Sequence, residues 1–148
     1  YIICAVGTGT MLAGLCEASS VEQQIIGIPV LKNEGSITFE INALLSENKK
    51  NCFKLLHEYH FGGYAKKNNE LLTFMHSLEI NENIPTDFVY TGKLLYAVND
   101  LIEKQYFKPD SKILVVHSGG LQGNRSLYTN AQSKTSSNAD FNFDFTSS

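Results

Sequence analysis

The 148-residue sequence lacks the features of membrane proteins and of nucleic-acid-binding proteins. It has no apolar run near the ~18–20 residues that a membrane-spanning helix needs, and no recognisable signal peptide. It also has no cluster of basic residues, and its net charge is -3 at pH 7. A surface that neutralises nucleic-acid phosphates needs an excess of Lys and Arg. We therefore expect neither a membrane nor a nucleic acid among its partners.

Cysteine is scarce as well. The sequence has three cysteines, an odd number, and they show neither CxxC nor Cys/His spacing: Cys4, Cys16 and Cys52. This favours small buried hydrophobes in a reducing compartment over a disulfide or zinc framework. His57 and His60 lie in a segment that we read as extended, where residues three apart point to opposite faces. The sequence therefore predicts a cytoplasmic protein with no metal site.

What is present is the composition of a globular domain, with 43% hydrophobic and 18% charged residues. Short apolar runs alternate with segments of helical periodicity, which predicts an α/β fold of three layers with a largely parallel open sheet. Residues 36–48 are mixed and ambiguous between helix and strand. Strands are predicted at 2–5, 24–31, 52–59 and in the run that begins at 112, and helices at 10–19, 68–80 and 92–107.

The C-terminal segment has a different composition. Residues 124–148 are rich in Ser, Asn and Thr and show neither a helical nor a strand period. We expect this segment to be a poorly ordered tail, and residues 1–123 to form the folded unit.

Ligands of open α/β sheets bind outside the carboxyl ends of the strands, and two strands here end in glycine-rich loops, at 7–10 and 118–120. A third loop, at 90–92, precedes a helix. The loop at 7–10 joins a strand to a helix, so its backbone N–H groups and hydroxyls can face one anion beside the positive end of the helix dipole. The alternative is a tight turn that holds only water. The candidate anion donors are Gly7, Thr8, Gly9 and Thr10.

Two common phosphate motifs do not fit this loop. The dinucleotide fingerprint GxGxxG fails because Leu12 stands at its third glycine, and the P-loop fails because Leu15 and Cys16 replace its Lys and Ser/Thr. A small phosphate monoester remains. Tyr64 and Tyr90 lie in or beside glycine-containing loops, and we expect them to form an aromatic wall with an ionisable phenol.

Four motifs, in this order, resemble the 1-aminocyclopropane-1-carboxylate deaminase / D-cysteine desulfhydrase family. This family consists of pyridoxal-phosphate enzymes with the tryptophan synthase β-like fold (fold type II). The resemblance runs from about residue 1 to 123 and covers only the C-terminal half of the family's sequence. The motifs are AVGTGTMLAGL, YHFGGYAKKNNELL, DFVYTGKLLYAVNDLI and ILVVHSGGLQG.

The resemblance implies roles for the loop residues. Gly7, Thr8, Gly9 and Thr10 would cradle the phosphate of pyridoxal 5'-phosphate. Tyr90 would stack on the cofactor's ring and Tyr64 would face the substrate, which makes both candidate catalytic residues. Ser118 would lie at the ring nitrogen, with Thr91 as a further cofactor-binding residue.

The resemblance also implies a substrate. Deaminases of the family resemble the motif YEG, so they have a carboxylate at the position where this sequence has Thr91. The hydroxyl of Ser118 is neutral, and it makes the cofactor a weaker electron sink than a carboxylate would. A weaker sink favours β-elimination of a good leaving group, as from D-cysteine, over cyclopropane ring opening.

The resemblance further implies that the complete protein is a homodimer acting on a small amino acid. The family's cofactor-bearing lysine belongs to the half that this sequence does not match, so we expect the chain alone to be inactive. The alternative is a non-catalytic phosphate- or nucleotide-binding α/β module.

Overall fold

Four parallel strands form one sheet in the order β3-β2-β1-β4. The structure is a computed structural model that describes residues 1–32 and 35–125. Short 3-10 helices are labelled η. In chain order the elements are β1 (Ile2–Val6), α1 (Thr10–Ala18), β2 (Ile25–Pro29), α2 (Ser36–Ala43), η1 (Glu47–Lys49), β3 (Phe53–Leu55), η2 (His57–Tyr59), α3 (Asn69–Glu82), α4 (Thr91–Glu103), β4 (Leu114–Val116) and η3 (Leu121–Asn124).

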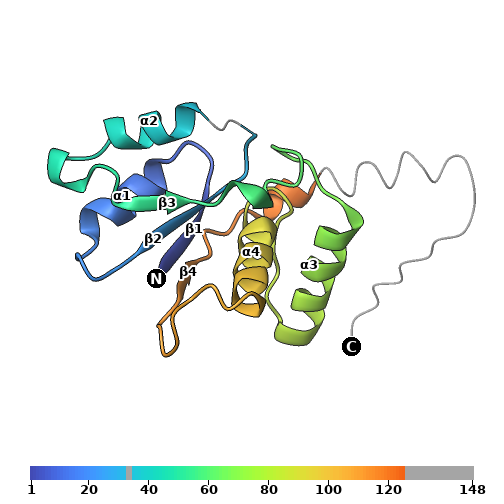
Figure 1. The fold of residues 1–148 in the computed structure, drawn as a ribbon. Coiled ribbons are helices and arrows are strands. Elements are labelled where there is room, and N and C mark those ends of the chain that lie inside the picture. The colour runs from blue at the N-terminus through green and yellow to red at the C-terminus, as the bar shows by residue number, and fades with distance from the viewer. Residues whose placement is uncertain (33–34, 126–148) are drawn as a thin grey trace, which may run out of the picture.

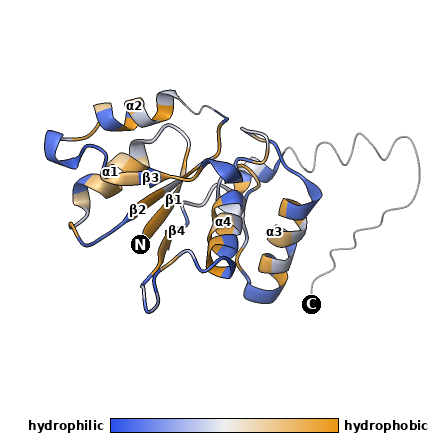
Figure 2. Cartoon of the chain, viewed as in Figure 1, coloured by the Kyte–Doolittle hydropathy of each residue, from blue (hydrophilic) through white to orange (hydrophobic). Residues whose placement is uncertain are grey.

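The sheet is the middle of three layers (Figure 1). Alternate residues of a strand face opposite sides, so Cys4 and Val6 pack against α1 and α2, whereas Ile3 and Ala5 pack against α4. Helix α3 lies outside α4 and buries Leu71 between them. The central strands are coloured hydrophobic and the outer turns hydrophilic in Figure 2, as a sheet covered on both faces requires. The predicted three-layer α/β fold with a parallel sheet is confirmed.

The structure resolves the ambiguous segment and corrects one strand. Within 36–48, residues 36–43 form helix α2. The prediction of a strand over 52–59 is wrong beyond residue 55, because the chain turns there into η2. Tyr59, in η2, packs in the core beside α4, and its hydroxyl donates to Asp100 Oδ2 at 2.7 Å. His57 and His60 are therefore not in an extended segment.

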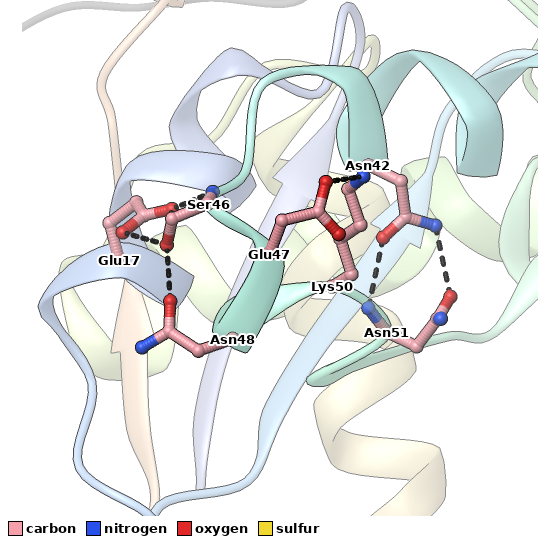
Figure 3. A network of polar contacts seen from close by, with 7 residues as sticks. All are labelled: Glu17, Asn42, Ser46, Glu47, Asn48, Lys50 and Asn51. Atoms are coloured by element: carbon pink, nitrogen blue, oxygen red, sulfur yellow. Dashed lines mark hydrogen bonds and ion pairs between the residues drawn. The ribbon is translucent and has the colours of Figure 1, made fainter.

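A polar network fastens the connection between α2 and β3 to α1 (Figure 3). The carboxylate of Glu17 accepts hydrogen bonds from the backbone N–H of Ser46 at 2.6 Å and from its hydroxyl at 2.9 Å. The side chains of Asn42 and Asn51 are joined as well, Asn42 Nδ2 donating to Asn51 Oδ1 at 3.0 Å. These contacts hold the C-terminal end of α2 in place. Ile37 and Ile41 of the same helix pack beside the loop after β1.

The longest described helix is α3, with 14 residues. Within residues 1–32 and 35–125, no helix combines the length and apolar character needed to cross a membrane.

Gly27, in the middle of β2, gives a test of how closely the side chains of the neighbouring strands and of α1 pack over β2. A Cβ at Gly27 would lie 2.6 Å from Val6 Cγ2 and 2.7 Å from Leu55 Cδ2. We expect Gly27→Ala to lower the free energy of unfolding by about 1–3 kcal/mol through overpacking, measured by urea denaturation. The matched control is Gly14→Ala on the exposed side of α1, where a Cβ would meet nothing within 4 Å. Equal stability of the two variants would contradict this packing.

Candidate functional site

The predicted loops converge on one open cavity at the carboxyl end of β1, with a volume of about 250 Å³. It brings together the loop after β1, the residue before α4 and the beginning of the segment after β4. Its lining residues are Ala5, Gly7, Thr8, Gly9, Thr10, Met11, Leu12, Tyr90 and Ser118.

A larger hollow, of about 610 Å³, lies between β3 and α4, away from these loops. Its polar groups are engaged with one another: Tyr59 and Lys104 both bond Asp100, and the Lys54 amine bonds the Tyr106 hydroxyl at 2.9 Å. A ligand there would have to displace these contacts. The smaller cavity is therefore the better candidate site.

The loop at 7–10 presents the start of α1 to the cavity. Gly9 precedes the helix with φ +84°, and a Cβ there would lie 2.4 Å from Ile41 Cγ1 of α2, so both backbone geometry and packing require glycine. No side chain caps the helix, and the hydroxyls of Thr8 and Thr10 lie 3.2 Å apart. The first N–H groups of a helix have no partner within it. Such a loop can bind an anion with backbone donors and two hydroxyls.

Tyr90 covers one side of this loop. A Cβ on Gly7 would lie 3.2 Å from Tyr90 Cε1, so the absence of a side chain at Gly7 makes room for the ring. Burial raises the pKa of Tyr90 above its usual value, and the Tyr64 phenol and the Asp87 charge add to the effect. At neutral pH the hydroxyl of Tyr90 therefore keeps its proton and can donate a hydrogen bond.

Tyr64 lies beside Tyr90 but outside the lining of the cavity. The two ring centroids are 6.3 Å apart, with planes inclined at 69°. The side chain of Tyr64 is 58% exposed, unlike that of Tyr90. Tyr64 is therefore an exposed side chain next to a ring that lines the cavity.

A buried carboxylate fixes the turn that carries Tyr90. Asp87 is fully buried, and its Oδ1 accepts the N–H groups of Val89 at 2.8 Å and Tyr90 at 2.7 Å. Its Oδ2 accepts the N–H of Thr91 at 3.0 Å and the hydroxyl of the same residue at 2.6 Å. The negative charge also lies at the positive end of the α4 dipole. Asp87 thus satisfies the free donors at the start of α4 and sets the backbone of Tyr90.

Thr91 is engaged in that arrangement and does not line the cavity. It is completely buried, and its hydroxyl donates to Asp87 Oδ2 while accepting the N–H of Asp87 at 2.9 Å. Direct cofactor binding by Thr91 stays a prediction. The structure connects Thr91 to the cavity only indirectly: Thr91 bonds Asp87, and Asp87 holds the turn that carries Tyr90.

The segment after β4, which brings Ser118 to the cavity, is fastened to the same turn. Asn124 Oδ1 accepts the N–H of Phe88 at 3.1 Å, and its Nδ2 donates to the Thr86 carbonyl at 2.9 Å. A Cβ on Gly120 would lie 3.4 Å from Asp87 Oδ2, so the backbone passes close to the buried carboxylate. Asn124 was expected to start the tail. The rest of that predicted tail, from residue 126 on, lies outside the described residues.

Lys93, in the first turn of α4, is the second fully buried charged group of this region. Its Nζ donates to the carbonyl oxygens of His60 at 2.9 Å and Gly63 at 2.7 Å. Burial lowers the pKa of Lys93 from 10.5 to about 8, against the opposing effect of the Asp87 charge. Lys93 therefore joins α4 to the glycine turn that precedes Tyr64.

Sequence reasoning missed Asp87, Lys93 and Asn124. A signal existed for Asp87, because an Asp a few residues before a predicted helix is a start signal, here four residues before Thr91. Lys93 looks like any lysine in a helix, and only the fold places its amine against two carbonyls. Metal-ligand chemistry has no candidate here, since no group of three or more His, Cys, Asp or Glu side chains within the described ranges could hold a metal ion.

The cavity suits a planar ring that carries a phosphate. The loop at 7–10 supplies anion donors, Tyr90 supplies an aromatic face and Ser118 supplies a hydroxyl at the cavity wall. The space above Gly7 that a Cβ would fill is taken by the Tyr90 ring, which brings the aromatic face next to the anion donors.

The chain is similar in sequence to curated proteins with two related names. The chain is 33% identical to a Pyrococcus horikoshii protein provisionally named 1-aminocyclopropane-1-carboxylate deaminase, with 82% of this chain and 40% of the relative covered. It is 31% identical to the D-cysteine desulfhydrase of Klebsiella pneumoniae, with 74% and 31% covered. The 1-aminocyclopropane-1-carboxylate deaminase of Rhizobium rhizogenes is 28% identical, with 81% and 40% covered.

A solved structure described as an ACC deaminase homologue superposes with a TM-score of 0.74 at 30% identity, over 89% of this chain and 43% of the other. No family model matches the chain. The chain spans about two fifths of the length of the first relatives it matches.

Replacing Asp87 tests whether its carboxylate organises the site. In Asp87→Asn an NH₂ group would face backbone donors, so at least one of them loses its acceptor inside the protein. We expect a loss of about 1–3 kcal/mol in the free energy of unfolding, measured by denaturant titration. The control is Asp110→Asn at an exposed left-handed position (φ 61°) that Asn adopts as readily as Asp. A stability equal to that of the control would contradict this role.

Proposed function

Because the chain is homologous to 1-aminocyclopropane-1-carboxylate deaminases and D-cysteine desulfhydrases, we propose that it is part of a pyridoxal-phosphate-dependent lyase. The proposed reaction is a D-cysteine desulfhydrase-like β-elimination on a small amino acid. The observation that carries the proposal is the convergence of an anion-binding loop, Tyr90 and Ser118 on one cavity. The chain spans about two fifths of the length of its first relatives, and we propose that it supplies part of the active site and is inactive without the remainder.

In this proposal each wall of the cavity has a distinct task. The backbone and hydroxyl donors of Gly7, Thr8, Gly9 and Thr10 hold the cofactor's phosphate. The ring of Tyr90 packs on the cofactor's ring, and the hydroxyl of Ser118 bonds its ring nitrogen. Pyridoxal phosphate, when bound, supplies an electron sink for the negative charge left after a proton is removed from Cα of the substrate.

Of the two tyrosines, Tyr64 is the one proposed to contact the substrate, and Tyr90 donates a hydrogen bond beside it. Tyr64 is exposed next to the cavity, so a substrate that enters can contact its hydroxyl, which then exchanges a proton or bonds the substrate carboxylate. The hydroxyl of Tyr90 keeps its own proton at neutral pH, because burial raises the pKa of that group. Tyr90 therefore acts as a donor and as a packing surface.

The neutral hydroxyl of Ser118 favours β-elimination over ring opening. Deaminases that resemble YEG have a carboxylate where this chain has Thr91, and that carboxylate would hold a positive charge on the ring nitrogen and strengthen the sink, whereas the hydroxyl of Ser118 does so only weakly. Departure of thiolate from Cβ needs less stabilisation than the opening of an unactivated cyclopropane. D-cysteine is therefore the proposed substrate.

The alternative function is a non-catalytic binder of phosphate compounds. The loop at 7–10 by itself would support it. Such a binder has no need of Tyr64 beside Tyr90, and this pairing favours the enzyme.

Tyr64→Phe in the full-length protein separates the two functions. We expect kcat with D-cysteine to fall by about 10²–10⁴-fold while the visible absorbance of the bound cofactor is retained, because only a proton-transfer group is lost. The matched control is Tyr106→Phe, whose hydroxyl bonds Lys54 in the other hollow. Undiminished turnover in Tyr64→Phe would remove Tyr64 from the chemistry. Absence of cofactor binding by the wild-type protein would favour the binder.

Side-by-side assays of two substrates test the proposed preference. The full-length protein is expected to release sulfide and pyruvate from D-cysteine faster than 2-oxobutanoate from 1-aminocyclopropane-1-carboxylate, compared by kcat/KM. The deaminase-like residue cannot simply be introduced at position 91. Thr91→Glu would set a second carboxylate against Asp87 in a fully buried place. Clear preference for the cyclopropane substrate would overturn the argument from Ser118.

A further inference from the structure

The segment around Tyr64 has an unfavourable backbone. Phe61, Gly62, Gly63 and Ala65 all have positive φ, at 51°, 94°, 116° and 52°. Left-handed conformations are unfavourable for Phe and Ala in particular, and such a run persists only where its surroundings hold it. The direction in which Tyr64 leaves the turn therefore depends on what fastens the turn.

Local hydrogen bonds close the turn on itself without attaching it to the rest of the protein. The N–H of Gly62 donates to His60 Nδ1 at 2.9 Å, and that of Gly63 donates to the His60 carbonyl at 2.9 Å. Phe61 adds an edge-to-face ring contact with Tyr96 at 5.0 Å between centroids. The ring of Phe61 also packs against the apolar cluster that contains Phe88 and Val89, but none of these hydrogen bonds reaches the start of α4, where Tyr90 is located.

Lys93 makes that attachment. Its amine donates to the carbonyls of His60 and Gly63, the two ends of the turn, and the latter directly precedes Tyr64. Lys93 also follows Thr91 by only two residues, in the first turn of a helix whose start is anchored by Asp87. One side chain thus ties the backbone of Tyr64 to the backbone that carries Tyr90.

A buried amine is costly unless its donors are satisfied, and Lys93 is completely buried. We propose that Lys93 is a positioning residue that holds the 60–63 turn and so fixes Tyr64 opposite Tyr90. This inference rests on the proposed function, because it gives Lys93 a purpose only if Tyr64 contacts the substrate. Lys93 itself is not among the residues that line the cavity.

The first test needs no turnover. In the full-length protein, Lys93→Met keeps the length and apolar stem of the side chain but removes its donors. Hydrogen–deuterium exchange of the amides at 61–66 is expected to become about tenfold faster or more, without comparable change in α1. The matched control is Lys104→Met at the end of α4, which loses an exposed bond to Asp100 instead. If the methionine variant does not fold, Lys93→Gln, with one amide donor on a shorter stem, is measured in its place.

The second test asks whether Lys93 acts through Tyr64. With D-cysteine, Lys93→Met is expected to lower kcat by about tenfold or more while the cofactor affinity stays within about threefold. In a Tyr64→Phe background the same change should lower kcat by less than about threefold, because the group that Lys93 positions is already lost.

Two results would overturn the proposal: unchanged exchange at 61–66 in Lys93→Met, or an equal fall in kcat with and without the Tyr64 hydroxyl. Failure of the proposed function has a different signature, namely a wild-type protein without cofactor or turnover. The exchange comparison still decides in that case whether Lys93 holds the turn.

Discussion

The candidate site depends on one buried carboxylate. Asp87 accepts hydrogen bonds from the N–H groups of three successive residues and from one hydroxyl, and it is shielded completely from water. In a low-dielectric place these charge-assisted bonds are strong, and removing the acceptor would leave buried donors unsatisfied. The position of Tyr90, the first turn of α4 and the path of the glycine segment at 119–123 all follow from where this carboxylate lies.

Around Asp87, the first turn of α4 connects the three loops of the site. Tyr90 reaches the loop at 7–10 by packing on Gly7. Lys93 reaches the 60–63 turn through two carbonyls. Asn124 brings the segment after β4 against the residues that precede Tyr90. The strands place these loops at one edge of a parallel sheet, and the polar contacts determine how the loops meet.

Much of this arrangement could be predicted from the sequence, for physical reasons that particular residues illustrate. Apolar runs such as residues 2–5 indicate buried strands directly. A glycine next to a hydroxyl residue, as at Gly9, indicates a turn that needs a left-handed backbone. The end of β3 could not be predicted, because Tyr59 leaves the strand to reach a partner on α4 that is 41 positions away. The task of Lys93 was hidden for the same reason, since its acceptors lie 33 and 30 positions earlier.

The resemblance to a family assigned residues to the cofactor. It did not describe the residues, such as Asp87, that hold those residues in position. Thr91 illustrates the difference. The family pattern places it beside a ligand, whereas here its hydroxyl is enclosed by Asp87 on both its donor and its acceptor side. A motif records which residue types recur at a site, and the hydrogen-bond partners of each residue have to be read from the three-dimensional arrangement.

The strand order has a consequence for how the molecule folds. Ile2 pairs with Ile25 on one side and with Leu114 on the other, so β1 gains one neighbour from nearby in the chain and its second from the far end. Closing the longer loop carries the larger entropy loss, and distant pairings slow folding. During synthesis the loop after β1 can therefore form with β2 and α1 before β4 leaves the ribosome. Ser118 and Asn124 follow β4 in the chain, so the cavity is completed only when that strand docks.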